Sequence, residues 1–251
     1  MSTSPLFVEL PINPNGNDFF IGDIHGAFGA LSEHLDSIHF NPKTDRLICV
    51  GDLIDRGSDS MQALDWLQRP YVFSVRGNHE ELYLQWCALQ STPTRQKTFE
   101  NEAYFRNGGQ WVQQHTWSEH LVLSSVLREL PYMLVVSNKL GKRIGVVHAG
   151  LPDGSSWPEL RDQPLSPFLL REMVWSTDRL HSHLGRSQKH IFDEGYIPGL
   201  DAIVCGHTKV ETPTWAGRFL HLETQGWKED GRFSSYSFDE IIRMSKRQSF
   251  C

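Results

Sequence analysis

The sequence Val50-Gly51-Asp52-Leu53-Ile54-Asp55-Arg56-Gly57 places two carboxylates and a guanidinium directly after the apolar run Leu47–Val50. A short apolar run of this kind is typical of a buried strand. Burying unpaired charged groups at the end of such a strand costs on the order of several kcal/mol for each group. These side chains therefore require metal ions, an anionic ligand or one another as partners.

The composition is that of an ordinary globular protein of 251 residues, of which 39% are hydrophobic and 22% are charged. This length fits one large domain or two small ones and can bury a substantial core. The formal charge of -6 argues against a nucleic-acid partner, because such a protein presents a basic face. The sequence leaves the oligomeric state open, with a monomer as the default expectation.

The four cysteines, Cys49, Cys87, Cys205 and Cys251, are widely spaced and form no CxxC pair. Cys49 and Cys205 lie inside apolar runs, which predicts buried thiols and no disulfide framework. This pattern is typical of a reducing compartment, so we expect a cytoplasmic protein. The N-terminus lacks the basic start and apolar stretch of a signal peptide, and no apolar run reaches the length of a membrane span, so we expect no membrane partner.

Strand and helix patterns alternate through the first third of the chain. Residues 1–17 are rich in Pro, Asn and Gly, and we expect a loose N-terminal arm there, followed by a single domain over 18–251. Strands are predicted at 19–21, 47–50 and 71–75, each followed by apolar residues at helical spacing. This order predicts a parallel sheet covered by helices, with ligands gathering beyond the carboxyl ends of its strands.

The rest of the chain predicts a second sheet. Residues 91–130 interrupt the alternation and are expected to form a mostly helical insertion that borders the site. Paired strands at 132–136 and 144–147, a buried strand at 202–205 and antiparallel strands within 218–242 follow. The expected fold is α/β, with two packed sheets and helices on the outside.

Five apolar runs each end in residues that are common metal ligands. Carboxylate, imidazole and amide oxygen together suit first-row divalent ions such as manganese, iron or zinc, and the lack of a thiolate argues against a structural zinc site. Two metal ions a few ångströms apart are the usual device for phosphoryl hydrolysis. The residues are Asp23 with His25, Asp52, Asn78, His148 and His207.

Each of these residues also has an ordinary structural interpretation. Asp23 and Asn78 are acceptable helix caps, and Asp55 with Arg56 makes an acceptable surface ion pair of small energetic value. A single strand-end histidine is more often hydrogen-bonded than metal-bound. The ordinary interpretations require the same coincidence at five strand ends, so the combined pattern favours a metal site.

The strand-end motifs resemble those of the phosphoprotein phosphatase family of metallophosphoesterases, and within it the bacterial and phage serine/threonine protein phosphatases. The motifs are very specific in combination and span most of the chain. The resemblance implies the calcineurin-like metallophosphoesterase fold, a β-sandwich of two mixed sheets flanked by helices. The matching segments are GDIHG at 22–26, GDLIDRG at 51–57, RGNHE at 76–80, HAG at 148–150, GHT at 206–208 and, for the bacterial and phage branch, Asn107-Gly108-Gly109.

The resemblance implies a dinuclear metal centre in which Asp52 bridges two divalent ions. Manganese is the expected metal, with iron and zinc as alternatives. A hydroxide activated by the metals would attack phosphorus directly, without a phosphoenzyme intermediate. The implied ligands are Asp23, His25 and Asp52 for one ion, and Asp52, Asn78, His148 and His207 for the other.

The resemblance also implies roles for four further side chains. Arg56 and Arg76 would clamp phosphate oxygens, for which a planar guanidinium is well suited. His79 would donate a proton to the leaving alkoxide, and Asp55 would fix the tautomer of His79 and favour its charged form. The ordinary interpretation of His79 is an exposed histidine in the first turn of a helix.

The chain departs from the family pattern in two places. Thr177 occupies the place of a further phosphate-binding arginine, which leaves Arg179, Arg186 or no residue as its replacement. Glu223–Gly226 reads Glu-Thr-Gln-Gly where relatives often show Asp-Thr-Gly, and we assign this segment no role.

The leading functional expectation is a metal-dependent phosphomonoesterase that acts on phosphorylated proteins or peptides, namely a serine/threonine protein phosphatase. An open site would also accept phosphotyrosine and give dual specificity. One alternative is a dinucleoside polyphosphate hydrolase of the diadenosine tetraphosphatase type, a family that tends to lack the Asp-Arg pair at 55–56 and to carry Asp at the place of Glu80. Another is a non-catalytic phosphate-binding scaffold, which usually lacks a ligand or the acid. The sequence does not define the physiological substrate.

Overall fold

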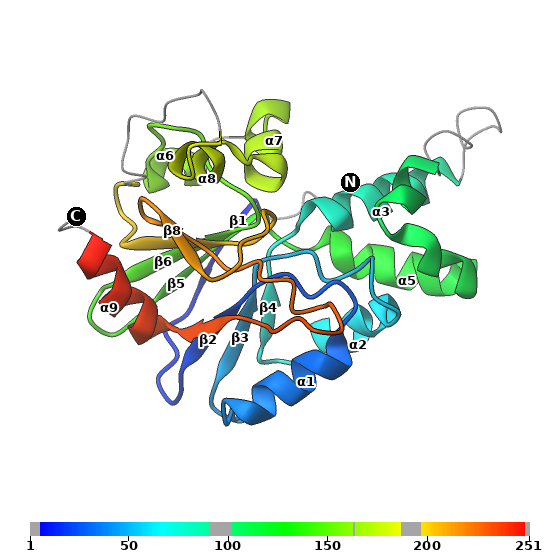
Figure 1. Ribbon diagram of the computed structural model, residues 1–251, viewed down its shortest axis with the longest axis horizontal. Helices are drawn as coiled ribbons and strands as arrows, with labels where there is room; N and C mark the ends of the chain where they lie inside the picture. The colour runs from blue at the N-terminus through cyan, green and yellow to red at the C-terminus, as the bar shows by residue number, and fades with distance from the viewer. Residues whose placement is uncertain (1–5, 91–101, 163, 187–196, 249–251) are drawn as a thin grey trace.

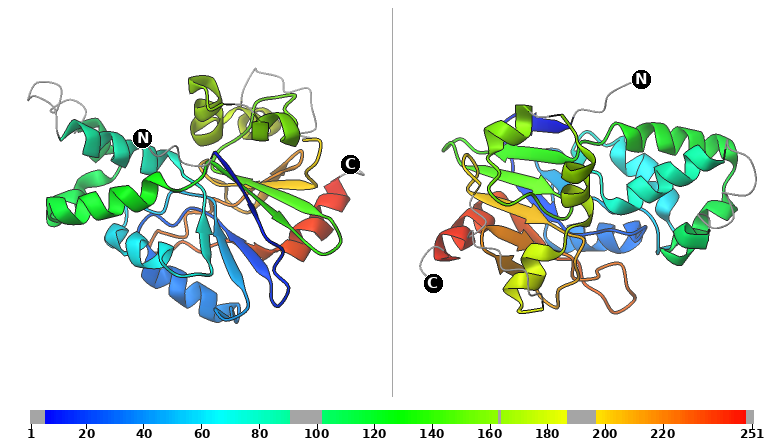
Figure 2. Two further views of the ribbon diagram at one scale, coloured as in Figure 1. Left: turned by 180° about the vertical axis from the view of Figure 1, so that it is seen from behind. Right: turned by 90° about the horizontal axis from the view of Figure 1, so that it is seen from above.

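The computed structural model describes residues 6–90, 102–162, 164–186 and 197–248 of the chain. Two β-sheets stack on each other in the centre, and helices cover their outer faces (Figures 1 and 2). The fold is therefore α/β with two mixed sheets and flanking helices, which confirms the predicted architecture. Within the described residues, no helix has both the length and the apolar character that a membrane span requires.

The four-stranded sheet contains the three strands predicted in the first third of the chain. Its order is β10-β2-β3-β4, in which β2, β3 and β4 are parallel and β10 is antiparallel to β2. The carboxyl ends of the three parallel strands therefore meet at one edge. The bounds are β2 Asp18–Ile21, β3 Arg46–Cys49, β4 Val72–Ser74 and β10 Ser235–Ser237.

The six-stranded sheet has the order β1-β5-β6-β7-β9-β8. The predicted hairpin is present as the antiparallel pair β5 and β6, and β6, β7 and β9 run parallel to one another. The bounds are β1 Phe7–Leu10, β5 Met133–Ser137, β6 Arg143–Val147, β7 Ala202–Cys205, β8 Thr214–Ala216 and β9 Phe219–His221.

The alternation of side chains along each strand decides which layer a residue packs in. In β2 and β3, Phe20 and Ile48 belong to the cluster between the two sheets, where they meet Leu134 of β5. Their neighbours Ile21 and Cys49 belong instead to the cluster under the helices that cover the four-stranded sheet. All of these side chains are almost fully buried, as expected for strands covered on both faces.

Helices from separate parts of the chain cover the two outer faces (Figure 1). One group packs beside the four-stranded sheet and a second beside the six-stranded sheet, while α9 sends Phe238, Ile241 and Ile242 into the cluster between the sheets. The first group comprises α1 Phe28–Ser37, α2 Ala63–Leu67, α3 Asn78–Leu89 and α5 Trp117–Arg128, with the 3-10 turns η1 Ser60–Gln62 and η2 Gly109–Gln114; the second comprises α6 Trp157–Asp162, α7 Pro167–Trp175 and α8 Asp178–His183; the last helix is α9 Phe238–Gln248.

Two sequence predictions about the ends of the chain were wrong. Residues 7–10 were expected within a loose arm, but they form β1, which pairs in parallel with β5 and buries Leu10. Antiparallel strands that close the second sheet were expected at 218–222, 232–238 and 241–242. β9 does pair antiparallel with β8, but it runs parallel to β7, β10 joins the four-stranded sheet, and residues 238–248 form a helix. Within the expected insertion, residues 102–130 are largely helical, and 91–101 lie outside the described residues.

Candidate active site

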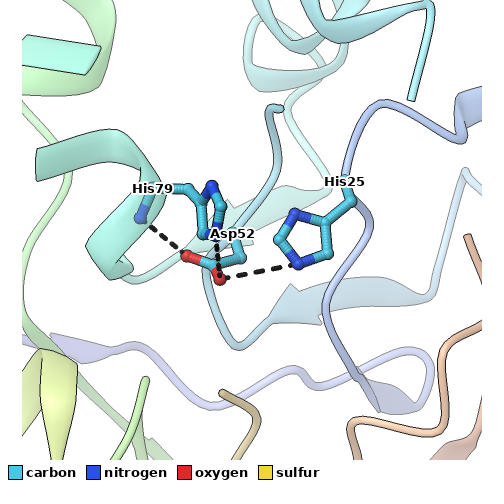
Figure 3. Close-up of side chains that lie close together, drawn as sticks. All are labelled: His25, Asp52 and His79. Carbon is cyan, nitrogen blue, oxygen red and sulfur yellow. Dashed lines mark hydrogen bonds and ion pairs between the residues drawn. The ribbon is translucent and has the colours of Figure 1, made fainter. Parts of the chain in front are cut away.

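The loops that follow β2, β3, β4, β6 and β7 bring the predicted metal ligands together. His25 Nε2 lies 3.6 Å from Asp52 Oδ2 and 3.9 Å from Asp23 Oδ2. Figure 3 shows His25 and His79 on either side of Asp52, with both rings directed toward its carboxylate. These four side chains come from three separate strand ends, yet each is almost completely buried.

Asp52 also faces a second group of ligands with its other oxygen. Its Oδ1 lies 3.3 Å from His148 Nε2. His148 Nε2 and His207 Nδ1 lie 2.8 Å and 2.9 Å from the Oδ1 atom of Asn78. Asp52 therefore directs one oxygen toward each group, an arrangement that suits a bridging carboxylate. The geometry brings all six predicted ligands into one cluster.

The hydrogen bonds of two histidines leave their Nε2 atoms directed into the cluster, where they are able to bind cations. His25 Nδ1 is 3.0 Å from the Ile54 carbonyl oxygen, and His148 Nδ1 is 2.8 Å from that of Val50. Because a carbonyl only accepts, each Nδ1 donates, so that in the neutral form of each ring the lone pair of Nε2 is directed into the cluster. His148 Nε2 and Asn78 Oδ1 lie 2.8 Å apart, and a shared cation would satisfy both lone pairs when the ring is neutral. The donor set thus fits hard or borderline divalent metal ions.

The electrostatics of the cluster favour positive charge. Burial, together with the nearby Glu223 carboxylate, raises the pKa of Asp23 well above its usual value. Burial lowers the pKa of His148, but the Asp52 carboxylate outweighs this effect and raises that pKa to about 9. Burial also raises the pKa of Asp52, but His148, His79 and His25 together hold it well below its usual value. Buried carboxylates in excess of their cationic partners attract metal ions.

The backbone that carries these groups is unusual. Five predicted site residues have left-handed backbone angles, a conformation that costs energy for residues other than glycine and is concentrated at functional sites. A Cβ atom at Gly77 would lie 2.2 Å from Asp52 Oδ1, and one at Gly206 would lie 1.8 Å from Asp23 Oδ1, so only glycine fits beside these carboxylates. The five residues are His25, Asp52, Asp55, Arg56 and His207, with φ of 46°, 48°, 70°, 66° and 62°.

Glu80 holds the loop after β3 in place, a role that was not predicted from the sequence. Its carboxylate accepts hydrogen bonds from the backbone N–H groups of Asp52, Leu53 and Gly77 at 2.9, 2.8 and 2.8 Å. The side chain is fully buried, and burial raises its pKa to about 7. A glutamate two residues after Asn78 thus connects the two motifs that supply the bridging ligand and the amide ligand.

Replacing Glu80 with glutamine is expected to lower the free energy of unfolding by about 1–3 kcal/mol, because the amide NH₂ must face a backbone N–H donor in a buried place. Urea unfolding of the purified protein measures this loss. Glu119→Gln is the matched control, since Glu119 caps an exposed helix end and its replacement should change the stability by about 0.5 kcal/mol or less. Equal effects of both substitutions would contradict the role assigned to Glu80.

Asp55 and His79 form a buried pair beside the metal-ligand cluster. Asp55 Oδ2 lies 2.8 Å from His79 Nδ1, and the residues are 0% and 1% exposed. Because the carboxylate accepts, His79 Nδ1 donates, and Nε2 is directed toward Asp52 Oδ2 at 3.8 Å. Burial lowers the pKa of His79, but Asp52 and Asp55 outweigh burial and raise it above its ordinary value. The arrangement suits a general acid.

Arg56 lies at the open side of the same cluster. Its guanidinium nitrogens lie 2.7 Å from His25 Nε2 and 3.1 Å from His79 Nε2, and the residue is exposed. The ring of Trp227 lies 5.3 Å from the guanidinium carbon, and Trp227 Nε1 donates to Glu223 Oε1 at 3.1 Å. The segment to which we assigned no role thus helps to position the arginine. In the sequence, the only indication of this contact was a tryptophan four residues after Glu223, whose ring is able to pack beside an arginine.

The contacts of Arg76 differ from the predicted phosphate clamp. Its guanidinium donates to Glu81 Oε1 and to the Tyr132 hydroxyl, both at 2.9 Å, and also to the carbonyl oxygens of Arg128 and Leu130. The residue is 6% exposed. These partners belong to α3, to the end of α5 and to the segment between α5 and β5, so Arg76 joins those elements. The guanidinium of Arg56, by contrast, contacts the ligand cluster through His25.

The replacements considered for the third phosphate arginine also lie elsewhere. Arg179 donates to Asp153 at 2.7 Å and packs over Phe219 at 4.5 Å. Arg186 is exposed at the end of the described segment 164–186. Neither arginine has a described contact with the ligand cluster.

The sequence matches the calcineurin-like phosphoesterase family over residues 19–211, which is most of the chain and includes every predicted metal ligand. The chain belongs to this family. Over 193 residues it is 33% identical to serine/threonine-protein phosphatase 1 of Salmonella typhimurium, an alignment that covers 75% of this chain and 76% of the relative. The predicted membership in the metallophosphoesterases is therefore confirmed, and the chain is a hydrolase of this family.

Other members of the calcineurin-like phosphoesterases resemble the chain as well. A symmetrical bis(5'-nucleosyl)-tetraphosphatase of a Shewanella species is 33% identical over 147 residues, which cover 58% of this chain and 48% of that relative. The crystal structure of a provisionally named diadenosine tetraphosphatase superposes with a TM-score of 0.62 at 20% identity, covering 93% of this chain and 94% of the other. This superposition supports the fold.

Proposed function

We propose that this metallophosphoesterase is a phosphomonoesterase that dephosphorylates serine and threonine side chains of proteins or peptides, with phosphotyrosine and aryl phosphates as further substrates. The observation that carries the proposal is the pair of His79 and Asp55, whose 2.8 Å contact lies directly beside the metal-ligand cluster. An alkoxide is a poor leaving group that needs a proton, so a positioned acid matters most for alkyl phosphates.

Two groups of side chains would each bind one metal ion. Asp23, His25 and Asp52 would hold one divalent ion, and Asn78, His148 and His207 with Asp52 would hold the second. The ions, when bound, supply an activated water nucleophile and neutralise the charge of the phosphoryl group. The cytoplasmic location and the use of manganese stay predictions from the sequence.

The other side chains act on the substrate. Arg56, held by Trp227 at the open side of the cluster, binds phosphate oxygens with its planar guanidinium. His79 Nε2 gives its proton to the leaving oxygen, while Asp55 keeps the ring in the orientation that directs Nε2 toward the cluster. Arg56 follows Asp52 and His79 follows Asn78 in the chain, so the clamp and the acid lie on two of the five loops that supply the metal ligands.

The second candidate is a dinucleoside polyphosphate hydrolase. The similarity to a bis(5'-nucleosyl)-tetraphosphatase supports it, although that alignment covers only 48% of the relative, against 76% for the serine/threonine phosphatase. Two features of this chain support the phosphatase, namely the Asp55–Arg56 pair and the glutamate at position 80.

A comparison of kcat/KM for a phosphoserine peptide and for diadenosine tetraphosphate, both with manganese, tests the proposal. We expect the peptide to be preferred by at least about tenfold. Protein carrying Asp52→Asn, purified in parallel, controls for a contaminating phosphatase. Preference for the dinucleotide would reverse the ranking, and phosphate binding without turnover of either substrate would favour the scaffold.

A further inference from the structure

We propose that Tyr104 and Trp111, on the mostly helical insertion, are positioning residues for the reaction, because they fix the carboxylate of Asp55 that orients His79. The inference rests on the proposed function insofar as His79 is the acid. It assigns a catalytic purpose to a segment that the sequence suggested only as a border of the site.

Three donors converge on Asp55. The Tyr104 hydroxyl and Trp111 Nε1 both donate to Oδ1 at 2.7 Å, and His79 Nδ1 donates to Oδ2 at 2.8 Å. Tyr104 and Trp111 are 3% and 4% exposed, and Asp55 is 0% exposed. The two aromatic residues lie 49 and 56 positions after Asp55 in the chain, so the insertion has to fold over the loop to make these contacts.

The chemistry of these donors fixes the orientation of the Asp55 side chain. An indole N–H only donates, and burial raises the pKa of the Tyr104 phenol well above its usual value, so this hydroxyl stays protonated and donates too. With all three partners donating, Oδ1 accepts from the two aromatic donors and Oδ2 accepts from His79. The oxygen that faces His79 is thereby fixed. Removal of one donor leaves Oδ1 short of a partner and releases the carboxylate to rotate.

The insertion also holds the neighbouring residue through the backbone. The Arg56 N–H donates to the Gly108 carbonyl oxygen at 3.0 Å, where Arg56 has a φ of 66°. A Cβ atom at Gly108 would lie 2.7 Å from Arg56 N, so a side chain there would separate the two segments. The insertion therefore supports both the residue that orients the acid and the residue that binds phosphate.

Tyr83 offers a matched control, because its ring belongs to the same aromatic cluster as the rings of Tyr104 and Trp111. Tyr83 is fully buried and its ring stacks on Trp111 with centroids 5.5 Å apart. Its hydroxyl contacts His120, at 2.9 Å from Nδ1 and 3.2 Å from the carbonyl oxygen. Tyr83→Phe and Tyr104→Phe thus each remove one buried hydroxyl from the same cluster, but only the second removes a partner of Asp55.

The kinetic test compares a phosphoserine peptide with p-nitrophenyl phosphate, whose leaving group needs no proton. We expect Tyr104→Phe to lower kcat for the peptide roughly tenfold more than kcat for the aryl phosphate, as a fraction of what a general acid contributes. Trp111→Phe should show the same selectivity, and Tyr83→Phe should leave both rates close to wild type. Equal losses on both substrates, or the same selectivity in Tyr83→Phe, would overturn the inference.

A spectroscopic test separates this inference from the proposed function. In zinc-loaded protein, which is diamagnetic, the downfield proton resonance of His79 Nδ1–H is assigned by its loss in His79→Asn. The resonance should move in Tyr104→Phe and in Trp111→Phe and stay in place in Tyr83→Phe. An unmoved resonance in Tyr104→Phe would overturn the positioning role. If His79→Asn lowers the rates on both substrates equally, the proposed acid role fails while this spectrum still decides the contact.

Discussion

Replacing Asp52 with asparagine is expected to lower the turnover of a phosphorylated peptide by on the order of 10³-fold or more, because several kcal/mol of charge stabilisation are lost with the metal pair. Asp52 directs one oxygen to His25 at 3.6 Å and the other to His148 at 3.3 Å. A neutral amide is a much weaker ligand and does not bridge two cations in this way. Metal analysis should show fewer than two ions per chain, alongside steady-state kinetics.

The control for this substitution is another buried aspartate. Asp45 is 7% exposed and accepts hydrogen bonds from the backbone N–H groups of Asn17 and Asn41, away from the ligand cluster. Asp45→Asn is expected to lower stability while metal content and kcat stay near wild type. Full metal content and substantial turnover in Asp52→Asn would exclude a bridging role for this carboxylate.

Replacing His79 with asparagine is expected to lower kcat for a phosphoserine peptide by about 10²–10⁴-fold, the range that a general acid contributes. The loss should be much smaller for p-nitrophenyl phosphate. His79 pairs with Asp55 and lies beside the cluster without belonging to the six predicted ligands, so the variant should retain two metal ions per chain. Steady-state kinetics on both substrates, with metal analysis, measure these effects.

His34→Asn is the control for that substitution, because His34 lies on α1 and contacts Ser235 at 2.7 Å. Its replacement should affect neither substrate selectively. The same fold loss of kcat on both substrates in His79→Asn would contradict the acid role, and loss of metal ions would show that His79 acts as a ligand.

Much of the ligand cluster was predictable from the sequence because each ligand follows a short apolar strand. Runs such as Leu47–Val50 are buried on both faces, and the parallel order of β2, β3 and β4 brings their ends to one edge. Residues such as Asp23 and Asn78, far apart in the chain, therefore meet without any need to know the details of packing.

The direction in which the Arg76 side chain extends was not predictable from its motif. A strand-end motif fixes where the backbone of an arginine lies, but its long side chain follows its acceptors. Those acceptors include the Tyr132 hydroxyl and the carbonyl oxygens of Arg128 and Leu130, more than fifty positions later in the chain. The local sequence does not encode that contact, so the motif alone suggested a phosphate clamp.

The contacts between the insertion and Asp55 were not predictable from the sequence for a related reason. Tyr104 and Trp111 in a helical segment are most simply interpreted as core residues, and their rings do pack in an aromatic cluster. Their second role, in positioning Asp55, is visible only from the hydrogen bonds that the Tyr104 hydroxyl and Trp111 Nε1 donate to its carboxylate. The strand β1 was missed because its run of four residues becomes a strand only by pairing with β5.

Anomalous X-ray diffraction from crystals grown with manganese would locate the metal ions relative to Asp52. We expect two anomalous peaks per chain, one beside Asp23 and His25 and one beside His148 and His207, with Asp52 next to both, and fewer peaks in crystals of Asp52→Asn. A wild-type crystal with a single peak, or with peaks away from Asp52, would contradict a metal pair bridged by Asp52.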